Sequence, residues 1–345
     1  MPDHDSPDLG RAELPRADLG GAELRHTDLR RVAVIGGGVN DEHEVSLASA
    51  AAVARAVHEL GLDVVPLTID RDGSWRHTDG AALCPAEAVA LLTTCDAAFP
   101  ALHGVHGEDG TVAGFLDLIG VPVVGSPVRA GALGMDKWVT KTIAESLGIS
   151  TAPAALIRAG ATAGALPFAP PLVVKPTTGG SSNGVSVVRH TGEYPAAIAS
   201  ARAAGPEVLV ESFVTGREID IAVFRDRSGA LRTGSTLEIG VADGALFGRE
   251  QKYDGTAEFV LPARLTDDEH AAVERAARTL YDTLGCAGVA RFDFFVTADG
   301  VVLNEVNTCP GFTKQSQVPQ MFAAVGLPYV ALVRELLDAA VTLTP

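Results

Sequence analysis

Three side chains with oxygen ligands lie close together near the end of the sequence. Asp293 occurs in ARFDFFV, and Glu305 and Asn307 occur in VVLNEVN, with the turn residues TADG between the two segments. Side chains alternate between the faces of a strand, so a hairpin groups Asp293 with Arg291 and Glu305 with Asn307. Mg²⁺ prefers oxygen ligands and often binds together with nucleotide phosphates. The pattern predicts a magnesium site beside an arginine.

A loop rich in glycine and serine forms a second candidate site. In VVKPTTGGSSNGVSVV an apolar strand ends at Lys175, and Ser181 and Ser182 lie in the loop that follows. Small residues let backbone N–H groups approach phosphate oxygens, and the lysine adds a positive charge. Such a loop is often only a turn, but its place upstream of the predicted metal hairpin favours phosphate binding.

Polar loops also follow two strands in the first part of the chain. GGGVNDEHEVS presents Glu42, and ALHGVHGEDG presents His103. The glycines suggest a dinucleotide fingerprint, but Asp41 stands where G-x-G-x-x-G requires its last glycine. Open α/β sheets bind ligands at the carboxyl ends of their strands, so we interpret these loops as a small-molecule pocket.

The elements that must position these residues follow from the hydrophobic pattern. Apolar runs alternate with a helical stretch from Arg31 onward, which predicts a parallel α/β domain over 31–126. One long helix is predicted from about Ala130 to Leu147. A connection rich in proline and alanine then covers 151–171.

Strand patterns and turn-rich pieces fill the rest of the chain. They favour antiparallel sheets with helices on one face, which we divide into a central subdomain, 127–214, and a C-terminal domain, 215–345. A T-x-x-E capping box at Thr266 and Glu269 predicts the start of a helix that ends at Gly285.

Composition excludes several classes of protein. The chain has 345 residues, 27 basic and 43 acidic, with a net charge of −16, which argues against nucleic acid or an anionic membrane as a partner. No apolar stretch is long enough to span a bilayer, and the first thirty residues lack the hydrophobic region of a signal peptide. The four cysteines are scattered, as in reduced proteins. We expect a cytoplasmic protein.

The beginning of the chain has a five-residue period. Residues 7–31 read PDLGR, AELPR, ADLGG, AELRH and TDLRR, with leucine at the same place in each unit. This is similar to the pentapeptide-repeat pattern, but it is long enough for little more than one coil, and stacked repeats need neighbours. We expect residues 1–30 to form a flexible, pentapeptide-like tail, with a docking strip for a partner as the alternative.

Seven motifs in order make the sequence resemble the D-alanine:D-alanine ligases of the ATP-grasp superfamily, from about Arg31 to Leu337. The motifs are EHEVSL, HGVHGEDG, MDK, GSSNG, QKYDGT, RFDFF and NEVNTCPGFTKQS. The resemblance implies an α/β and α+β chain with an ATP-grasp fold. A Rossmann-like N-terminal domain would precede two antiparallel-sheet domains that grip ATP. It also implies small amino-acid substrates and a homodimer.

The resemblance assigns roles to residues of this chain. The implied ligands of ATP are Lys137, Lys175, Ser181, Ser182 and Lys252 for the phosphates, and Glu211, Val214 and Glu218 for adenine and ribose. Two Mg²⁺ ions, with Mn²⁺ as a substitute, would be bound by Asp293, Glu305 and Asn307. The implied groups around the amino acids are Glu42 and His103 for the first, and Gly311 and Ser316 for the second.

Two further implications concern the chemistry. Arg291 would stabilise the oxyanion of a tetrahedral intermediate, and Glu42, Ser181 and Tyr253 would form a hydrogen-bonded set that closes the site. The Lys-Tyr pair of QKYDGT favours an amide product over an ester. ATP would activate a carboxylate as an acyl phosphate before an amine attacks it.

Three positions depart from the usual family pattern, namely Asn183, Lys314 and Gln317. The first hypothesis is a ligase that makes D-alanyl-D-alanine for peptidoglycan, and hence for cell-wall formation and cell shape. The three departures motivate a second hypothesis, a related ligase that joins other amino acids in specialised metabolism. A nucleotide-binding protein without catalysis is the third, and the intact set of acidic and basic site residues argues against it.

Overall fold

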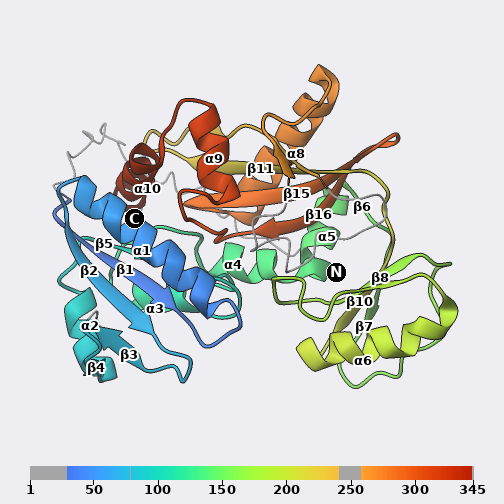
Figure 1. Cartoon of the computed structure of the whole chain (residues 1–345), viewed down its shortest axis with the longest axis horizontal. Helices are drawn as coiled ribbons and strands as arrows, with labels where there is room; N and C mark the ends of the chain where they lie inside the picture. The colour runs from blue at the N-terminus through green and yellow to red at the C-terminus, as the bar shows by residue number, and fades with distance from the viewer. Residues whose placement is uncertain (1–28, 78, 241–257, 344–345) are drawn as a thin grey trace, which may run out of the picture.

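Three β-sheets organise the chain. The structure is a computed structural model that describes residues 29–77, 79–240 and 258–343 (Figure 1). The sheets have five, four and seven strands, and Figure 1 shows them at the lower left, at the lower right and across the upper part of the molecule. Within the described ranges, no helix is both long and apolar enough to cross a membrane. The predicted residues Lys252 and Tyr253, and the tail up to residue 28, lie outside these ranges.

The five-stranded sheet confirms the expected α/β domain. Its strand order is β4-β3-β2-β1-β5, and β1 pairs in parallel with both β2 and β5. The strands are β1 (Arg31–Gly37), β2 (Asp63–Ile69), β3 (Trp75–His77), β4 (Ala82–Leu83) and β5 (Ala97–Pro100). The helices are α1 (His43–Glu59), α2 (Pro85–Leu92) and α3 (Thr111–Leu118). The loops after β1 and β5 lie at the carboxyl edge of the sheet, where ligands bind in such folds.

The four-stranded sheet is antiparallel, in the order β7-β10-β8-β9. Its strands are β7 (Ala154–Ile157), β8 (Leu172–Pro176), β9 (Ser186–Val188) and β10 (Val208–Ser212). A short 3₁₀ turn, η1 (Thr191–Glu193), leads into α6 (Tyr194–Ala204), which packs its apolar residues on the sheet. Val173, Lys175 and Glu211, on the opposite face, line a cavity.

The seven-stranded sheet carries the predicted metal hairpin. Its strands are β6 (Ser150–Thr151), β11 (Arg217–Arg225), β12 (Leu231–Thr233), β13 (Leu237–Gly240), β14 (Glu258–Val260), β15 (Val289–Thr297) and β16 (Gly300–Asn307). The helix α8 (Asp267–Leu284) packs on one face, and α9 (Gln317–Ala324) lies against the other. The capping box of Thr266 and Glu269 and the left-handed Gly285 at the end of α8 are both as predicted.

Two sequence predictions are wrong in this part of the chain. The single helix expected over Ala130–Leu147 is two helices, α4 (Val128–Met135) and α5 (Lys137–Ser146). Asp136 separates them in an extended conformation, and its carboxylate accepts hydrogen bonds from two backbone N–H groups of α5. The connection expected at 151–171 contains a strand, β7, which pairs with β10.

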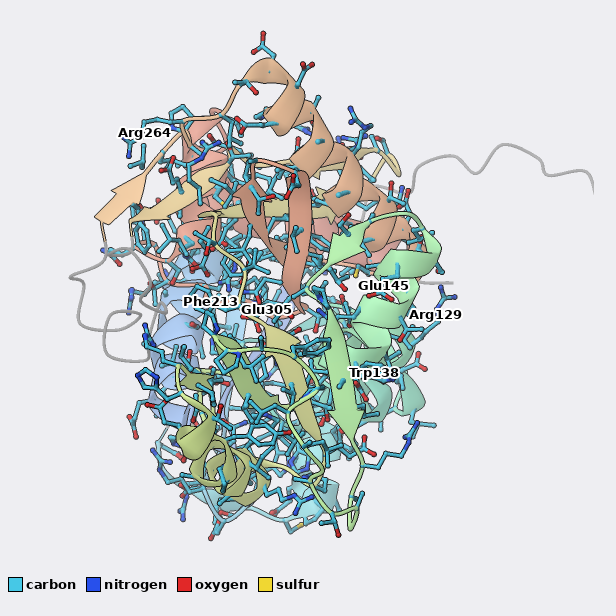
Figure 2. The ribbon with its side chains drawn as sticks, turned by 90° about the vertical axis from the view of Figure 1, so that its right-hand side faces the viewer. Arg129, Trp138, Glu145, Phe213, Arg264 and Glu305 are labelled. Atoms are coloured by element: carbon cyan, nitrogen blue, oxygen red, sulfur yellow. The ribbon has the colours of Figure 1, made fainter. Side chains whose placement is uncertain are left out.

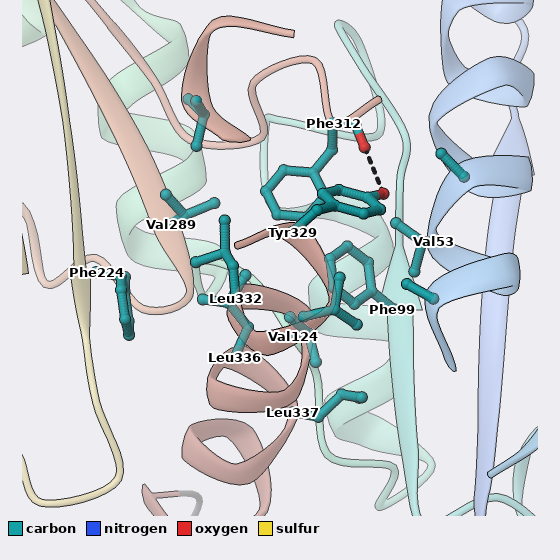
Figure 3. Close-up of a cluster of buried hydrophobic side chains, with 14 of the residues drawn as sticks. Val53, Phe99, Val124, Phe224, Val289, Phe312, Tyr329, Leu332, Leu336 and Leu337 are labelled. Atoms are coloured by element: carbon teal, nitrogen blue, oxygen red, sulfur yellow. Dashed lines mark hydrogen bonds between the residues drawn. The ribbon is translucent and has the colours of Figure 1, made fainter. Parts of the chain in front are cut away.

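One apolar cluster joins the first domain to the large sheet. The helix α10 (Tyr329–Leu343) packs against α1, and the two share a core with Phe99 of β5 and Phe312 (Figure 3). The hydroxyl of Tyr329 donates to the backbone carbonyl of Phe312 at 2.8 Å. Leu29, at the end of the repeat segment, is also buried in this cluster. The cluster fixes the loops of the first domain beside the hairpin of the large sheet.

Candidate active site

A cavity of about 380 Å³ lies between the four-stranded and seven-stranded sheets. Eight of the residues assigned from sequence line it, namely Lys137, Lys175, Ser181, Ser182, Glu211, Val214, Glu218 and Glu305. Two of the lining residues, Phe213 and Glu305, are labelled in Figure 2. Phe295 and Leu303 add apolar surface that sequence reasoning missed. A cavity with apolar walls and a cationic end suits a nucleotide.

Two buried lysines share one carboxylate at the cavity wall. Glu211 forms ion pairs with Lys175 at 2.6 Å and with Lys141 at 2.7 Å. Burial alone would raise the pKa of Glu211, but the two ammonium groups hold it below its usual range. Burial lowers the pKa of Lys141, and Glu211 opposes that shift. With both lysines protonated, the three groups carry a net positive charge, which attracts phosphate. Lys141 was not predicted, although it lies one helical turn after Lys137.

The glycine- and serine-rich loop has an unusual backbone. Ser181 and Ser182 adopt positive φ values of 51° and 57°. Residues other than glycine rarely adopt this left-handed backbone conformation, which costs about 1 kcal/mol or more per residue. The Lys137 ammonium donates to the Gly179 carbonyl at 2.8 Å and lies 3.7 Å from Glu305. Backbone strain in a loop beside a lysine is typical of a segment that binds a ligand.

Glu42 of the first domain contacts this loop directly. The Ser181 hydroxyl donates to Glu42 Oε1 at 2.6 Å. A Cβ on Gly104 would lie 2.6 Å from Glu42 Oε2, and one on Gly180 would lie 2.9 Å from it. Glycine at these two positions lets the carboxylate fit between the loops. The Asn183 amide adds a second contact to the first domain, 3.2 Å from Asp41.

His103 is buried near the same carboxylate. Its Nδ1 lies 2.8 Å from the Cys309 carbonyl, which only accepts, so Nδ1 carries the proton. Its Nε2 lies 3.1 Å from the Ser49 hydroxyl of α1. Burial lowers the pKa of His103, so the ring is neutral at physiological pH. Ser49 was not predicted, and a polar residue inside an apolar helix is the signal that could have indicated it.

The β15–β16 hairpin pairs the predicted residues as expected. Arg291 lies opposite Asn307, and Asp293 opposite Glu305. Arg291 binds Asp293 through Nε and Nη2, both at 2.7 Å, and Asn307 donates to Asp293 at 3.0 Å. Burial alone would lower the pKa of Arg291, but Asp293 raises it well above its usual value. The arginine therefore stays charged.

The segment after the hairpin holds the predicted second-substrate residues. The Ser316 hydroxyl accepts from the Thr313 N–H at 3.0 Å and lies 2.8 Å from the Thr313 hydroxyl. A Cβ on Gly311 would lie 3.4 Å from the Ser316 oxygen, so the Gly311 backbone is close to this hydroxyl. Both residues precede α9, which follows on from Ser316.

Comparisons with known proteins agree with this geometry. The sequence model described as "D-ala D-ala ligase C-terminus" matches residues 156–338, and that described as "D-ala D-ala ligase N-terminus" matches residues 31–91 and 84–126. D-alanine--D-alanine ligases of Mycobacterium sp. (strain KMS) and Rhodococcus opacus (strain B4) are each 38% identical, over 90% of this chain and 96% of theirs. The chain belongs to the D-alanine:D-alanine ligase family.

Solved structures of this ligase family have the same fold. The VanG D-Ala:D-Ser ligase from Enterococcus faecalis matches with a TM-score of 0.75 and 32% identity, over 90% of this chain and 99% of that one. The D-alanine-D-alanine ligase from Coxiella burnetii matches with a TM-score of 0.75 and 26% identity, over 91% and 94%. The fold is ATP-grasp, and the chain is an ATP-dependent ligase.

Ligases of this family generally require a metal ion, and the hairpin supplies suitable donors. Asp293, Glu305 and Asn307 offer hard oxygen atoms on adjacent strands, while ATP phosphates and water complete the coordination that Mg²⁺ prefers. In the described part of the chain, no cluster of three or more histidine, cysteine, aspartate or glutamate side chains forms a metal site. Of the three proposed ligands only Asp293 and Glu305 are carboxylates, which suits an ion that arrives with a nucleotide.

Proposed function

We propose that this chain joins two molecules of D-alanine into D-alanyl-D-alanine for peptidoglycan synthesis, with ATP converted to ADP and phosphate. The observation that carries the proposal is the contact between Ser181 and Glu42. It connects the phosphate loop to the carboxylate proposed to bind the first amino acid. The proposed domain boundaries are 31–126, 127–214 and 215–345, in a cytosolic homodimer.

The chemistry requires activation of a carboxylate, because oxide is a poor leaving group. An oxygen of the first D-alanine attacks the γ-phosphorus of ATP, the bond to ADP breaks, and an acyl phosphate forms. Such transfer depends on positioning and on neutralising charge. Lys137, Lys175, Ser181 and Ser182 line the cavity. The two lysines would hold the phosphates, and the two serines would cover them. Val214, Glu218 and Glu211 would contact adenine and ribose.

The second step forms the peptide bond. The amine of the second D-alanine attacks the carbonyl carbon, phosphate leaves, and the amine loses a proton. Arg291 would stabilise the oxyanion of the tetrahedral intermediate, because it remains charged and buried. When bound, Mg²⁺ at Asp293, Glu305 and Asn307 would neutralise phosphate charge.

The substrates would be oriented by residues on both sides of the hairpin. Glu42 would accept from the ammonium of the first D-alanine, and His103 would lie near its carboxylate. Ser316 and the Gly311 backbone would bind the carboxylate of the second. Lys252 and Tyr253, outside the described residues, keep the roles that the resemblance implies, at the γ-phosphate and with Glu42 in closing the site.

One assay tests the proposal. Purified protein is incubated with ATP, Mg²⁺ and single or paired amino acids, and phosphate release and dipeptide mass are measured. Turnover with D-alanine alone is the expected result. Turnover only with another pair, for example D-alanine with D-serine, would favour the alternative that Asn183, Lys314 and Gln317 suggest. ATP binding without any turnover would contradict the proposal.

A further inference from the structure

Gln317 connects two charged groups of the large sheet. It is the first residue of α9 and directly follows Ser316. Its Oε1 accepts from Arg291 Nη1 at 2.8 Å, and its Nε2 donates to Asp220 Oδ2 at 3.0 Å. Asp220 lies on β11, opposite Asp293, and is fully buried. Arg291 Nε also lies 3.6 Å from Asp220 Oδ2, so the carboxamide adds a hydrogen-bonded link to a direct but longer ion pair.

The chemistry of the three groups fixes the direction of this link. A guanidinium only donates hydrogen bonds, and an ionised carboxylate only accepts them. A carboxamide has one acceptor end and one donor end, so glutamine matches both partners in a single orientation. Methionine or leucine at this position makes neither bond. Glutamate would bind the arginine but repel Asp220.

Gln317 also binds the one terminal nitrogen of the Arg291 guanidinium that Asp293 does not bind. Asp293 binds Nε and Nη2, whereas Nη1 points to Gln317. Asp293 is a proposed metal ligand, so its bond to the arginine competes with metal coordination. Gln317 and Asp220 are not among the proposed metal ligands. They can restrain the guanidinium whether or not Asp293 binds a metal.

We propose that Gln317 is a positioning residue for Arg291, which it orients toward the oxyanion formed when the second substrate attacks, by coupling the guanidinium to Asp220. The inference rests on the proposed function, because it presumes that Arg291 stabilises the oxyanion. It explains why a polar side chain replaces the usual aliphatic one directly after Ser316. The proposal also implies that Gln317 acts on Arg291 together with Asp220.

Kinetics of Gln317→Met and Gln317→Glu test this role. Loss of a hydrogen bond to a charged group predicts a roughly tenfold to hundredfold fall in kcat/KM for the second D-alanine. The KM values for ATP and for the first D-alanine should change less than about twofold, a split that a general structural defect would not produce. Gln320→Met is the matched control, since Gln320 of the same helix donates to the Gln315 backbone carbonyl and, among the described residues, has no hydrogen bond to Arg291 or Asp220.

A double-mutant cycle separates coupling from local packing. In an Asp220→Val background, Gln317→Met should have a clearly smaller effect than in the native chain, because Gln317 then bonds only Arg291 and no longer couples it to Asp220. Equal effects in both backgrounds would overturn the proposal. Full activity of Gln317→Glu would also overturn the proposal. This second test does not depend on whether Asp220→Val folds.

A readout independent of turnover separates this inference from the proposed function. Crystal structures of the native chain and of Gln317→Met should show the Arg291 guanidinium in one position in the first and displaced or in several positions in the second. An unchanged position of the Arg291 guanidinium in Gln317→Met would contradict the positioning role, even if the variant is active. If D-alanine is not a substrate but the guanidinium moves as expected, the substrate assignment fails and the positioning role stands.

Discussion

Glu42 and Ser181 are 139 positions apart in the sequence, yet their side chains meet at 2.6 Å. Glu42 precedes α1 at the carboxyl edge of the five-stranded sheet, and Ser181 lies in the strained loop between β8 and β9. The bond therefore joins the first domain to the phosphate loop. Because Glu42 lies between Gly104 and Gly180, the fold would set the distance between the proposed first-substrate site and the proposed phosphate loop.

Ser181→Ala should lower ligase activity by roughly tenfold to hundredfold, the range expected for a hydrogen bond to a carboxylate. The loss should include a higher KM for the first D-alanine, because Glu42 would lose a restraint. Steady-state kinetics with each amino-acid site varied would measure it. Asn183→Ala is the neighbouring control, since its contact with Asp41 is longer and exposed, and we expect less than about a threefold change. Equal losses in both variants would contradict this account.

Local patterns in the sequence predicted the hairpin, the capping box and the α/β domain, because each depends on residues that are near in sequence. Contacts between segments that are distant in the sequence could not be predicted in the same way. Asp220 is a lone charge in an apolar strand, which signals a buried partner, but only the structure identifies that partner as Gln317. The break at Asp136 was missed because an N-cap inside a helical pattern resembles an ordinary polar residue.

Lys141→Met tests the shared carboxylate at the wall of the ATP cavity. Without Lys141, Glu211 would neutralise Lys175 alone, so the phosphates would meet less positive charge. We expect the Kd for ATP to rise by about tenfold and the free energy of unfolding to fall by about 2 kcal/mol. Calorimetric titration and urea unfolding would measure the two effects. Arg158→Met removes an exposed partner of Glu207 and should change neither quantity noticeably.

Glu305→Gln tests the proposed metal site. The variant keeps the shape of the side chain but loses the charge that attracts a divalent cation. At fixed ATP, we expect the Mg²⁺ concentration for half-maximal activity to rise by about tenfold, and chelation to abolish the activity of the native enzyme. Asp299→Asn, in the turn of the same hairpin, is the control and should keep the native Mg²⁺ dependence. An unchanged requirement in Glu305→Gln would remove Glu305 from the ligands.

Leu332→Ala tests the cluster that joins α10 to the first domain. Leu332 is fully buried, and truncating a buried leucine costs about 2–5 kcal/mol. Urea unfolding should show a loss within that range. Leu118→Ala is the matched control, because Leu118 is 87% exposed on α3, and its effect should stay within about 0.5 kcal/mol. Similar losses in the free energy of unfolding for both variants would contradict the assignment of Leu332 to the buried core.

The stability of the chain should depend on pH through His103. Burial lowers the pKa of this imidazole in the folded protein, so below the ordinary histidine value of 6.5 the unfolded chain binds a proton that the folded chain does not. Stability is therefore fully present above about pH 6.5 and falls by up to about 1.4 kcal/mol per pH unit below it, until the folded pKa is reached. Urea unfolding from pH 5 to pH 8 should show a shallower slope for His103→Asn than for the native chain. His58→Asn, which changes an exposed histidine, should follow the native curve. Parallel curves for the native chain and His103→Asn would mean that His103 takes up its proton equally in both states.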